Sequence, residues 1–309
     1  MAGKRPATRS KWPPTQSQIS VAAKRRGDAW RACLAGLCLA QAWAGVSPAI
    51  AEDPCSAVGA RRGLVLSVNE RLELALNGGE TLKIVGIDPP RPTPEDPDLD
   101  TKSRDRLASW LAGREVLFRP LGERHDRWGR TAALVFAAAG DPSSAVLSVG
   151  EALLDAGLAR FEASADVRPC RAALLAAEAS ARATALGVWG DPYYAVIAAA
   201  DRESFSEKAG TSVIVEGRVT HVDVGGVRMT LLFGPRRGWD FSLTILQRNI
   251  KKFDAAGLNL AGSAGRALRV RGLLDMQFGP QIEISGPDAV EVITQDRDEA
   301  AADPASPRR

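Results

Sequence analysis

The chain has 309 residues, 45% of them hydrophobic, and a formal net charge of +3. This length and apolar content are enough for about two domains, each with a sizeable core. Residues 1–51 hold eight Lys or Arg and one acid, which leaves 32 basic and 36 acidic residues in the rest of the chain. A mildly acidic remainder excludes a global positive field, so any nucleic-acid binding would need a local basic face.

The first 51 residues have the pattern of a secretory signal peptide. A basic and polar stretch precedes an apolar run over residues 32–46, and Ala49 and Ala51 form an A-x-A cleavage site. The run is shorter than the roughly twenty residues of a spanning helix, although an uncleaved anchor stays open as an alternative. We expect an exported protein, periplasmic or secreted, with no membrane span after cleavage.

Two cysteines remain after this cleavage, Cys55 and Cys170. An even cysteine count in an exported protein predicts one disulfide rather than a metal site or a catalytic thiol, and two free buried thiols are the alternative. The two histidines, His125 and His221, lie far apart in the sequence. A zinc site is therefore not expected.

Strands and helices are mixed between residues 62 and 194. Alternating apolar residues from Leu64 to Leu76, a turn at residues 77–79 and a strand over 82–87 predict a β-meander. The other expected elements are strands over 116–118 and 131–136 and helices over 101–111, 148–157 and 171–186.

Chemistry is expected where the strand over residues 82–87 ends. Asp88 follows this strand, and Pro89 and Pro90 cannot donate to a sheet ladder, so the carboxylate lies at a strand mouth. Some forty residues later, the sequence Asp-Arg-Trp-Gly-Arg over 126–130 predicts a polar turn. This turn sets Arg130 at the start of another strand.

These two stretches resemble motifs of the staphylococcal-nuclease (thermonuclease) family, which has a GID-x-P-E strand end and a D-[RK]-[YW]-G-R turn. Residues 149–160 are similar to the family's NEALVxxGLAK helix, and residues 177–189 to its last helix and G-[IV]-W ending. The resemblance covers residues 59–194. It implies a barrel of five strands and three helices of the oligonucleotide/oligosaccharide-binding (OB) type. It also implies phosphodiester hydrolysis with Ca²⁺ on acidic ligands, a glutamate base and two phosphate-binding arginines.

Carried over residue by residue, the resemblance makes Asp88 a metal ligand and Arg130 a phosphate-binding arginine. Other positions depart from the family pattern: Glu70 lies near the first-strand aspartate, Lys83 replaces the second arginine, and Arg91 replaces the base glutamate. A guanidinium cannot accept a proton from water, and it places a positive charge beside a calcium site. The sequence therefore predicts a degenerate catalytic site.

Other roles stay open for these residues. Glu95 or Asp96 could act as the base only if the Pro-rich loop folded back. Asp88 could instead cap a loop, and Arg130 could be an ordinary salt-bridged arginine. The residues that would still form an anion-binding patch are Lys83, Arg91, Arg127 and Arg130.

The second half of the chain returns to strands after a polar stretch over residues 195–210, which predicts a linker. The expected elements are strands over 212–224, 227–233 and 239–243, a helix near 246–253, and strands over 267–274 and 281–285. Three strands, a helix and two strands predict a second OB-fold-like barrel over 211–293. The charged residues 294–309 predict a disordered tail.

Basic and aromatic residues interleave in this second half. Because nucleic-acid bases stack on aromatic rings while the backbone follows basic grooves, they suggest a site for single-stranded nucleic acid. The alternative is that the aromatic residues fill the core and the basic residues are solvated. The predicted contacts are Arg236, Arg237, Trp239, Lys251 and Lys252, and Arg269 and Arg271 belong to the same basic set.

Together these patterns predict an exported thermonuclease-like protein, with its first domain over 52–194, that binds nucleic acid or another anionic ligand rather than cleaving it efficiently. Two alternatives are a weak or altered Ca²⁺-dependent nuclease and an envelope scaffold for protein partners. Ca²⁺ is expected as a cofactor only if the nuclease site functions, and no other cofactor is implied.

Overall fold

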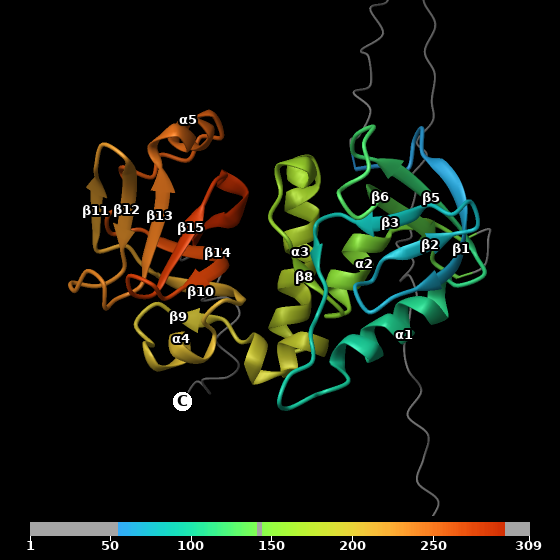
Figure 1. Ribbon diagram of the computed structural model, residues 1–309, viewed down its shortest axis with the longest axis horizontal. Coiled ribbons are helices and arrows are strands. Elements are labelled where there is room, and N and C mark those ends of the chain that lie inside the picture. The colour runs from blue at the N-terminus through green and yellow to red at the C-terminus, as the bar shows by residue number, and fades with distance from the viewer. Residues whose placement is uncertain (1–54, 141–143, 294–309) are drawn as a thin grey trace, which may run out of the picture.

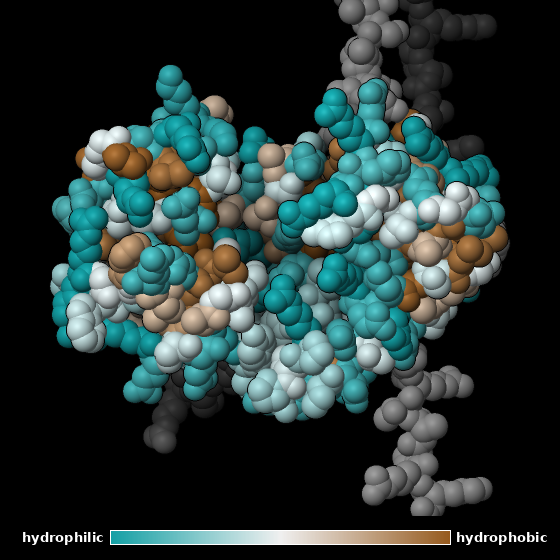
Figure 2. Space-filling model, in the orientation of Figure 1, coloured by the Kyte–Doolittle hydropathy of each residue, from teal (hydrophilic) through white to brown (hydrophobic). Residues whose placement is uncertain are grey.

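The computed structural model describes residues 55–140 and 144–293, which form two domains (Figure 1). The predicted signal peptide and charged tail lie outside the described residues. Hydrophilic residues predominate on the face shown in Figure 2, with apolar residues in separate patches on both domains. Within the described ranges, no helix has the length and apolar character needed to cross a membrane.

The N-terminal domain is a barrel with three helices packed around it. Its sheet has the order β3-β2-β1-β5-β6-β7, and an additional parallel pairing of β3 with β6 closes five strands into the barrel. This confirms the predicted nuclease-type barrel. The strands are β1 (Arg61–Val68), β2 (Leu74–Leu76), β3 (Thr81–Ile84), β5 (Glu115–Pro120), β6 (Arg130–Ala138) and β7 (Val146–Ser148).

Apolar residues of the predicted meander form much of the barrel core, but the first strand has the opposite face inward. Leu74, Leu76 and Leu82 are buried as the alternation predicts. In β1 the buried residue is Val65, whereas Leu64 and Leu66 are 37% and 58% exposed, so the predicted inner face of this strand is wrong. Gly79 supplies the left-handed residue of the turn between β2 and β3, with φ at +80°. The strand over 82–87 is divided at Gly86, so that β4 (Ile87–Asp88) pairs with β8 (Arg160–Phe161) outside the barrel.

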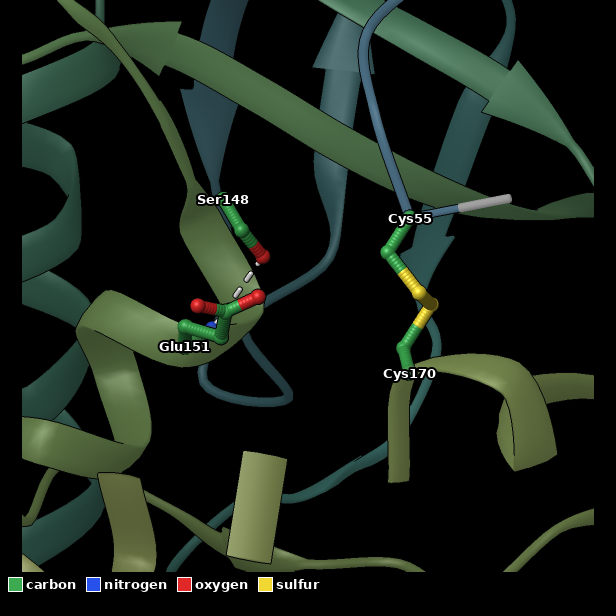
Figure 3. Close-up of a disulfide and its surroundings, with 4 residues drawn as sticks. All are labelled: Cys55, Ser148, Glu151 and Cys170. Atoms are coloured by element: carbon green, nitrogen blue, oxygen red, sulfur yellow. Dashed lines mark hydrogen bonds between the residues drawn. A yellow bond between two sulfur atoms is a disulfide. The ribbon is translucent and has the colours of Figure 1, made fainter. Parts of the chain in front are cut away.

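Three helices and a disulfide complete this domain. The helices are α1 (Leu99–Leu111), α2 (Val149–Asp155) and α3 (Arg171–Ala183), with short 3₁₀ turns at Ala165–Cys170, Gly187–Gly190 and Pro192–Tyr194. The Ser148 hydroxyl caps α2 by accepting the backbone N–H of Glu151 at 3.3 Å. Near this helix start, Cys55 and Cys170 form the predicted disulfide, which joins the segment before β1 to the start of α3 (Figure 3).

The C-terminal domain is mainly β. Its strands have the order β11-β12-β13-β15-β14-β10-β9, with β16 paired to β14 and β13 parallel to β15. The observed sequence of strands, one helix and further strands agrees with the prediction, but the first strand is divided in two and β16 was not predicted. The elements are β10 (Ser212–Arg218), β11 (His221–Val224), β12 (Arg228–Leu232), β13 (Ser242–Leu246), α5 (Gln247–Ala255), β14 (Ala267–Asp275), β15 (Gln281–Ile284), a 3₁₀ turn (Pro287–Ala289) and β16 (Val290–Ile293).

Residues 195–210, for which the sequence predicts a linker, are structured. They form β9 (Ile197–Ala198), which pairs in parallel with β10, and α4 (Glu203–Glu207). Phe205 is fully buried and stacks on Phe241 with 5.5 Å between ring centroids. The polar composition concealed this packing, because a few apolar residues are enough to attach the segment to the C-terminal core.

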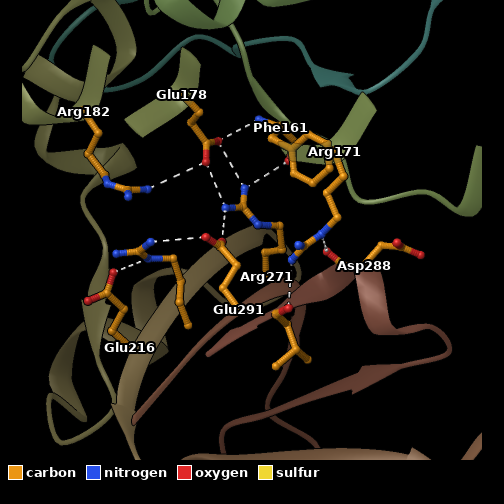
Figure 4. Close-up of polar contacts among 10 residues, drawn as sticks. Phe161, Arg171, Glu178, Arg182, Glu216, Arg271, Asp288 and Glu291 are labelled. Atoms are coloured by element: carbon orange, nitrogen blue, oxygen red, sulfur yellow. Dashed lines mark hydrogen bonds and ion pairs between the residues drawn. The ribbon is translucent and has the colours of Figure 1, made fainter. Parts of the chain in front are cut away.

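The two domains meet through buried charged residues between α3 and β14 (Figure 4). The Arg271 guanidinium donates to both carboxylate oxygens of Glu178, at 3.1 and 2.9 Å, and to Glu291 at 2.7 Å. Glu178 also accepts the backbone N–H of Phe161 at 2.7 Å. Burial lowers the pKa of Arg271, but the carboxylates of Glu178 and Glu291 outweigh it and leave the pKa raised. Arg271 therefore stays charged inside the interface.

Further ion pairs and hydrogen bonds surround this centre. Arg168 makes a bidentate ion pair with Asp288, at 2.9 and 2.7 Å, and Arg171 donates to the backbone carbonyl of Val290 at 2.9 Å. Arg269 pairs with Glu216 and Glu291. Arg269 and Arg271, which the sequence grouped with ligand-binding residues, thus lie in or beside the domain interface.

Candidate functional site

A cleft of about 540 Å³ opens in the N-terminal domain beside the end of β3. Five residues that the sequence singled out line it together: Glu70, Lys83, Asp88, Arg91 and Arg130. They come from the turn between β1 and β2, from the segment that runs from β3 into the Pro-rich loop, and from the start of β6. The other lining residues are Arg71, Glu73, Ile84, Ile87, Pro89, Pro90, Pro92 and Asp100.

The turn at Gly86 brings Asp88 to the cleft. Gly86 has φ at +78°, and a Cβ there would lie 2.9 Å from Cδ1 of Leu174. A larger residue would therefore be strained and would collide with α3. The chain turns tightly between β3 and β4, which directs the residues after β3 along the cleft wall.

Arg130 is held by two carboxylates. Its Nε lies 2.7 Å from Oδ2 of Asp126, and its Nη1 donates to Glu73. The side chain is only 13% exposed. The Arg130 hydrogen bond lowers the pKa of Asp126 to about 2, and that of Arg130 is raised in turn. Most donors of this guanidinium are occupied, in the salt-bridged arrangement that the sequence left open.

Glu73 is a cleft residue that the sequence reasoning missed. It is buried, and besides Arg130 it accepts the Asn69 amide at 2.7 Å. A signal was present, because Glu73 stands between Leu72 and Leu74, both fully buried. A carboxylate between two core leucines needs a partner, and Arg130 supplies it.

The other cleft carboxylates are also engaged. Glu70 pairs with Arg104 at 2.5 Å, and Asp88 pairs with Arg160 at 2.8 Å. Asp100 accepts the backbone N–H of Thr101 at 2.6 Å.

Calcium requires several oxygens that converge on one point. Among the described residues, no group of three or more His, Cys, Asp or Glu is arranged to hold a metal ion. Bound calcium would have to replace guanidinium partners at Glu70, Glu73 and Asp88, with Arg91 close by. The residues present therefore do not fit a calcium site of the kind that the nuclease resemblance implies.

Two cleft cations, Arg71 and Arg91, have exposed side chains with no hydrogen bond or ion pair within the described part of the chain. Lys83 makes a half-exposed ion pair with Glu162 at 3.0 Å. Exposed pairs of this kind are weak and exchange readily. Arg71 and Arg91, with Lys83 beside them, are the donors that an incoming anion can reach.

The remaining residues of the predicted patch lie on the turn before β6. Arg127 lies over the ring of Trp128, 3.9 Å from its centroid, and Arg130 approaches the same ring at 4.6 Å. Trp128 is 59% exposed. Arg127 is not part of the cleft lining, and neither are the alternative bases, Glu95 and Asp96. Asp96 pairs instead with Lys102.

The predicted contacts of the C-terminal domain are divided between two ends of the domain. Arg236, Arg237 and Trp239 lie in the loop before β13, whereas Lys251 and Lys252 lie in α5, which follows β13. A strand of this length separates its ends by roughly 13 Å. The structure therefore does not bring the lysines together with the tryptophan loop.

A second exposed aromatic residue lies beside the Trp239 loop. Trp239 and Phe278 are each 70% exposed, and Gly279 packs so closely on Gly238 that a Cβ on it would lie 2.2 Å from the Gly238 carbonyl oxygen. The loops before β13 and before β15 are thus in direct contact. Arg237 in this region pairs with Asp223 at 2.5 Å.

The comparison with protein families bears on the cleft directly. Residues 81–191 match the family model described as staphylococcal nuclease homologue. The N-terminal domain is staphylococcal-nuclease-like. The matched range begins at β3 and includes Lys83, Asp88, Arg91 and Arg130, whereas the C-terminal domain lies beyond it. No curated protein matches the chain. The nuclease-like domain therefore carries the cleft, and the match extends to neither the C-terminal domain nor the described segment before β3.

Proposed function

We propose that the nuclease-like domain binds single-stranded nucleic acid through its phosphates in the cleft and does not cleave it efficiently. One observation carries this proposal: Glu70, Glu73 and Asp88 are each bound by a guanidinium, while Arg71 and Arg91 are open to solvent. A cleft in which guanidinium groups bind three of the four carboxylates, and in which two exposed arginines have no partner among the described residues, favours an anion over a metal ion.

The chemistry of hydrolysis also weighs against efficient cleavage. Attack by water needs a nearby group that accepts a proton, and a guanidinium such as that of Arg91 cannot act as that base. The same guanidinium can donate two parallel hydrogen bonds to a phosphate, and Lys83 adds a compact positive charge. The positions that depart from the family pattern thus remain suited to binding a phosphate.

We propose the Trp239 loop as a second contact for the same single-stranded nucleic acid. Trp239 and Phe278 present two exposed rings from adjoining loops, and Arg236 lies in the same loop as Trp239. Stacking of a base on an aromatic side chain contributes about 1–3 kcal/mol and tolerates any base. Lys251 and Lys252 would belong to this contact only if the bound nucleic acid continued past β13 to α5.

Fluorescence anisotropy with a labelled single-stranded oligonucleotide tests the cleft. We expect replacement of Arg71 and Arg91 together by Ala to weaken binding about tenfold at low salt and to reduce its salt dependence. Arg62→Ala is the matched control, because Arg62 is exposed and pairs with Glu115 on the neighbouring strand outside the cleft. Equal binding by the double variant and the wild type would contradict the proposed cleft.

The second candidate is a weak or altered Ca²⁺-dependent nuclease, in which the cleft carboxylates would have to exchange their present arginine partners for the ion. Turnover of single-stranded DNA and RNA, with Ca²⁺ or with a chelator, separates the two. Calcium-dependent cleavage that Asp88→Asn abolishes would establish the nuclease. Absence of both binding and cleavage would leave the protein-scaffold role.

We also propose that the protein is exported. The disulfide between Cys55 and Cys170 supports this, because such bonds persist in oxidising compartments, and the apolar run before Ala51 supplies the signal. Mass spectrometry of the protein from fractionated cells should give a mature chain that begins at Glu52. An intact N-terminus in a cytoplasmic fraction would contradict it.

A further inference from the structure

The strand pair β4–β8 connects the cleft to the C-terminal domain. β4 carries Asp88, and each strand of the pair has only two residues. The backbone groups of Phe161 in β8 are bound at the interface. Glu178 accepts the Phe161 N–H at 2.7 Å, and Arg271 donates to the Phe161 carbonyl at 3.3 Å. So short a pair has little stability of its own, and the domain interface holds it in place.

The side chain of Arg160 extends this connection. Its Nη2 lies 2.8 Å from Oδ2 of Asp88 and 3.0 Å from the carbonyl oxygen of Ser212, the first residue of β10. The side chain is 10% exposed and lies over the ring of Tyr194, 4.8 Å from its centroid. One guanidinium therefore binds the cleft carboxylate and the backbone of the C-terminal domain at once.

Tyr194 holds the next part of the cleft wall. Its hydroxyl accepts the backbone N–H of Arg91 at 2.7 Å and donates to the Arg91 carbonyl at 3.2 Å. Pro89, Pro90 and Pro92 have no N–H, so the Arg91 N–H is the one backbone donor between residues 89 and 92. Burial raises the pKa of Tyr194, so the hydroxyl keeps its proton at neutral pH.

We propose that Arg160 and Tyr194 are positioning residues through which the C-terminal domain sets the cleft wall at residues 88–91. Arg160 fixes Asp88, Tyr194 fixes the backbone of Arg91, and the stacking of Arg160 on Tyr194 joins the two anchors. The orientation of the Arg91 guanidinium toward a ligand then depends on the domain interface. This inference rests on the proposed function only where ligand affinity is the measured quantity.

Hydrogen exchange tests the positioning in the absence of any ligand. In the full chain, we expect Tyr194→Phe to accelerate exchange of the Arg91 amide about fivefold, because one neutral hydrogen bond is lost. Arg160→Gln should accelerate exchange over residues 86–91. The matched control is Arg168→Gln, which breaks the interface ion pair with Asp288 and touches no cleft residue.

Two results in this experiment would overturn the inference. One is unchanged exchange at Arg91 in Tyr194→Phe together with unchanged exchange over 86–91 in Arg160→Gln. The other is equal acceleration in Arg168→Gln, which would mean that any loosening of the interface has the same effect. Exchange in β6 is the internal reference, because the polar partners of Arg160, Arg168 and Tyr194 among the described residues all lie outside that strand.

Oligonucleotide binding tests whether the positioning matters for the ligand. Tyr194→Phe should weaken binding about fivefold in the wild type and by less than about twofold in an Arg91→Ala background, because Tyr194 acts through Arg91. Equal weakening in both backgrounds would refute that route. If the wild type binds no oligonucleotide, the proposed function fails, while the exchange measurement still decides the positioning inference.

Discussion

Removing the charge of Glu178 perturbs the centre of the domain interface. Glu178 is fully buried and accepts hydrogen bonds from Arg271 and from the backbone of Phe161, with Arg182 3.7 Å away. Glu178→Leu leaves the Phe161 N–H without an acceptor and removes one of the two carboxylates that neutralise Arg271. The variant therefore leaves a positive charge inside the interface only partly compensated.

The expected loss of stability follows from these contacts. Breaking a buried ion pair from one side costs about 3–5 kcal/mol. Glu291 still binds Arg271 at 2.7 Å, which favours the lower end, and the unsatisfied Phe161 N–H adds about 1 kcal/mol. We expect Glu178→Leu to lower the free energy of unfolding by about 4 kcal/mol. Adding Arg271→Met should recover at least about 2 kcal/mol, because the uncompensated charge is then absent.

Urea unfolding followed by circular dichroism, with the disulfide intact, measures these differences. Glu115→Gln is the control: it breaks an ion pair whose two side chains are more than half exposed, and it should change stability by less than about 1 kcal/mol. If Glu178→Leu had no greater effect than Glu115→Gln, or if Arg271→Met only deepened the loss, the network would not be the buried, mutually neutralising group that we describe.

Three further outcomes are expected. Burial raises the pKa of Glu291, but Arg271 and other arginines outweigh burial and leave the pKa lowered. The stability that the Glu291 carboxylate contributes is therefore complete above about pH 5 and is lost as the pH falls through the folded-state pKa. Between pH 7 and pH 3, the urea midpoint should fall less in Glu291→Gln than in the wild type. Replacing Cys55 and Cys170 by Ser opens a loop with a sequence separation of 115 residues and should lower stability by about 4 kcal/mol, measured against the oxidised wild type by urea unfolding. Arg91→Glu with Lys83→Arg should raise whatever cleavage of single-stranded DNA the protein shows with Ca²⁺, and an unchanged rate would show that the missing base is not what limits activity.

The location of the cleft could be predicted from sequence because its elements leave local signals. An apolar run that ends at Asp88 before two prolines indicates the end of a strand. The sequence Asp-Arg-Trp-Gly over residues 126–129 indicates a turn directly before Arg130. The pairing of Glu73 with Arg130 joins residues 57 positions apart, and no local pattern predicts which cation a buried carboxylate will meet. Residue types could therefore be assigned to the site, but their partners could not.

The domain interface was missed for a related reason. Glu178 occupies the buried face of α3 together with Leu174 and Ala181. The sequence signal was a glutamate at helical spacing from the apolar residues of the same face. In an Ala-rich helix, however, such a glutamate is easily mistaken for a solvent-exposed residue. Its partner Arg271 alternates along β14 as a surface residue would. Only the packing of the second domain on α3 distinguishes an interface arginine from a solvated one.

The polar character of this interface has a consequence for how the chain is made. The N-terminal domain is synthesised first, and the face that will receive β14 carries Glu178 and the backbone groups of Phe161. Water can satisfy these groups until the partner strand exists, so the nascent domain does not expose a large apolar surface at this face. Before the C-terminal domain is synthesised, the N-terminal domain therefore has little tendency to aggregate through this face.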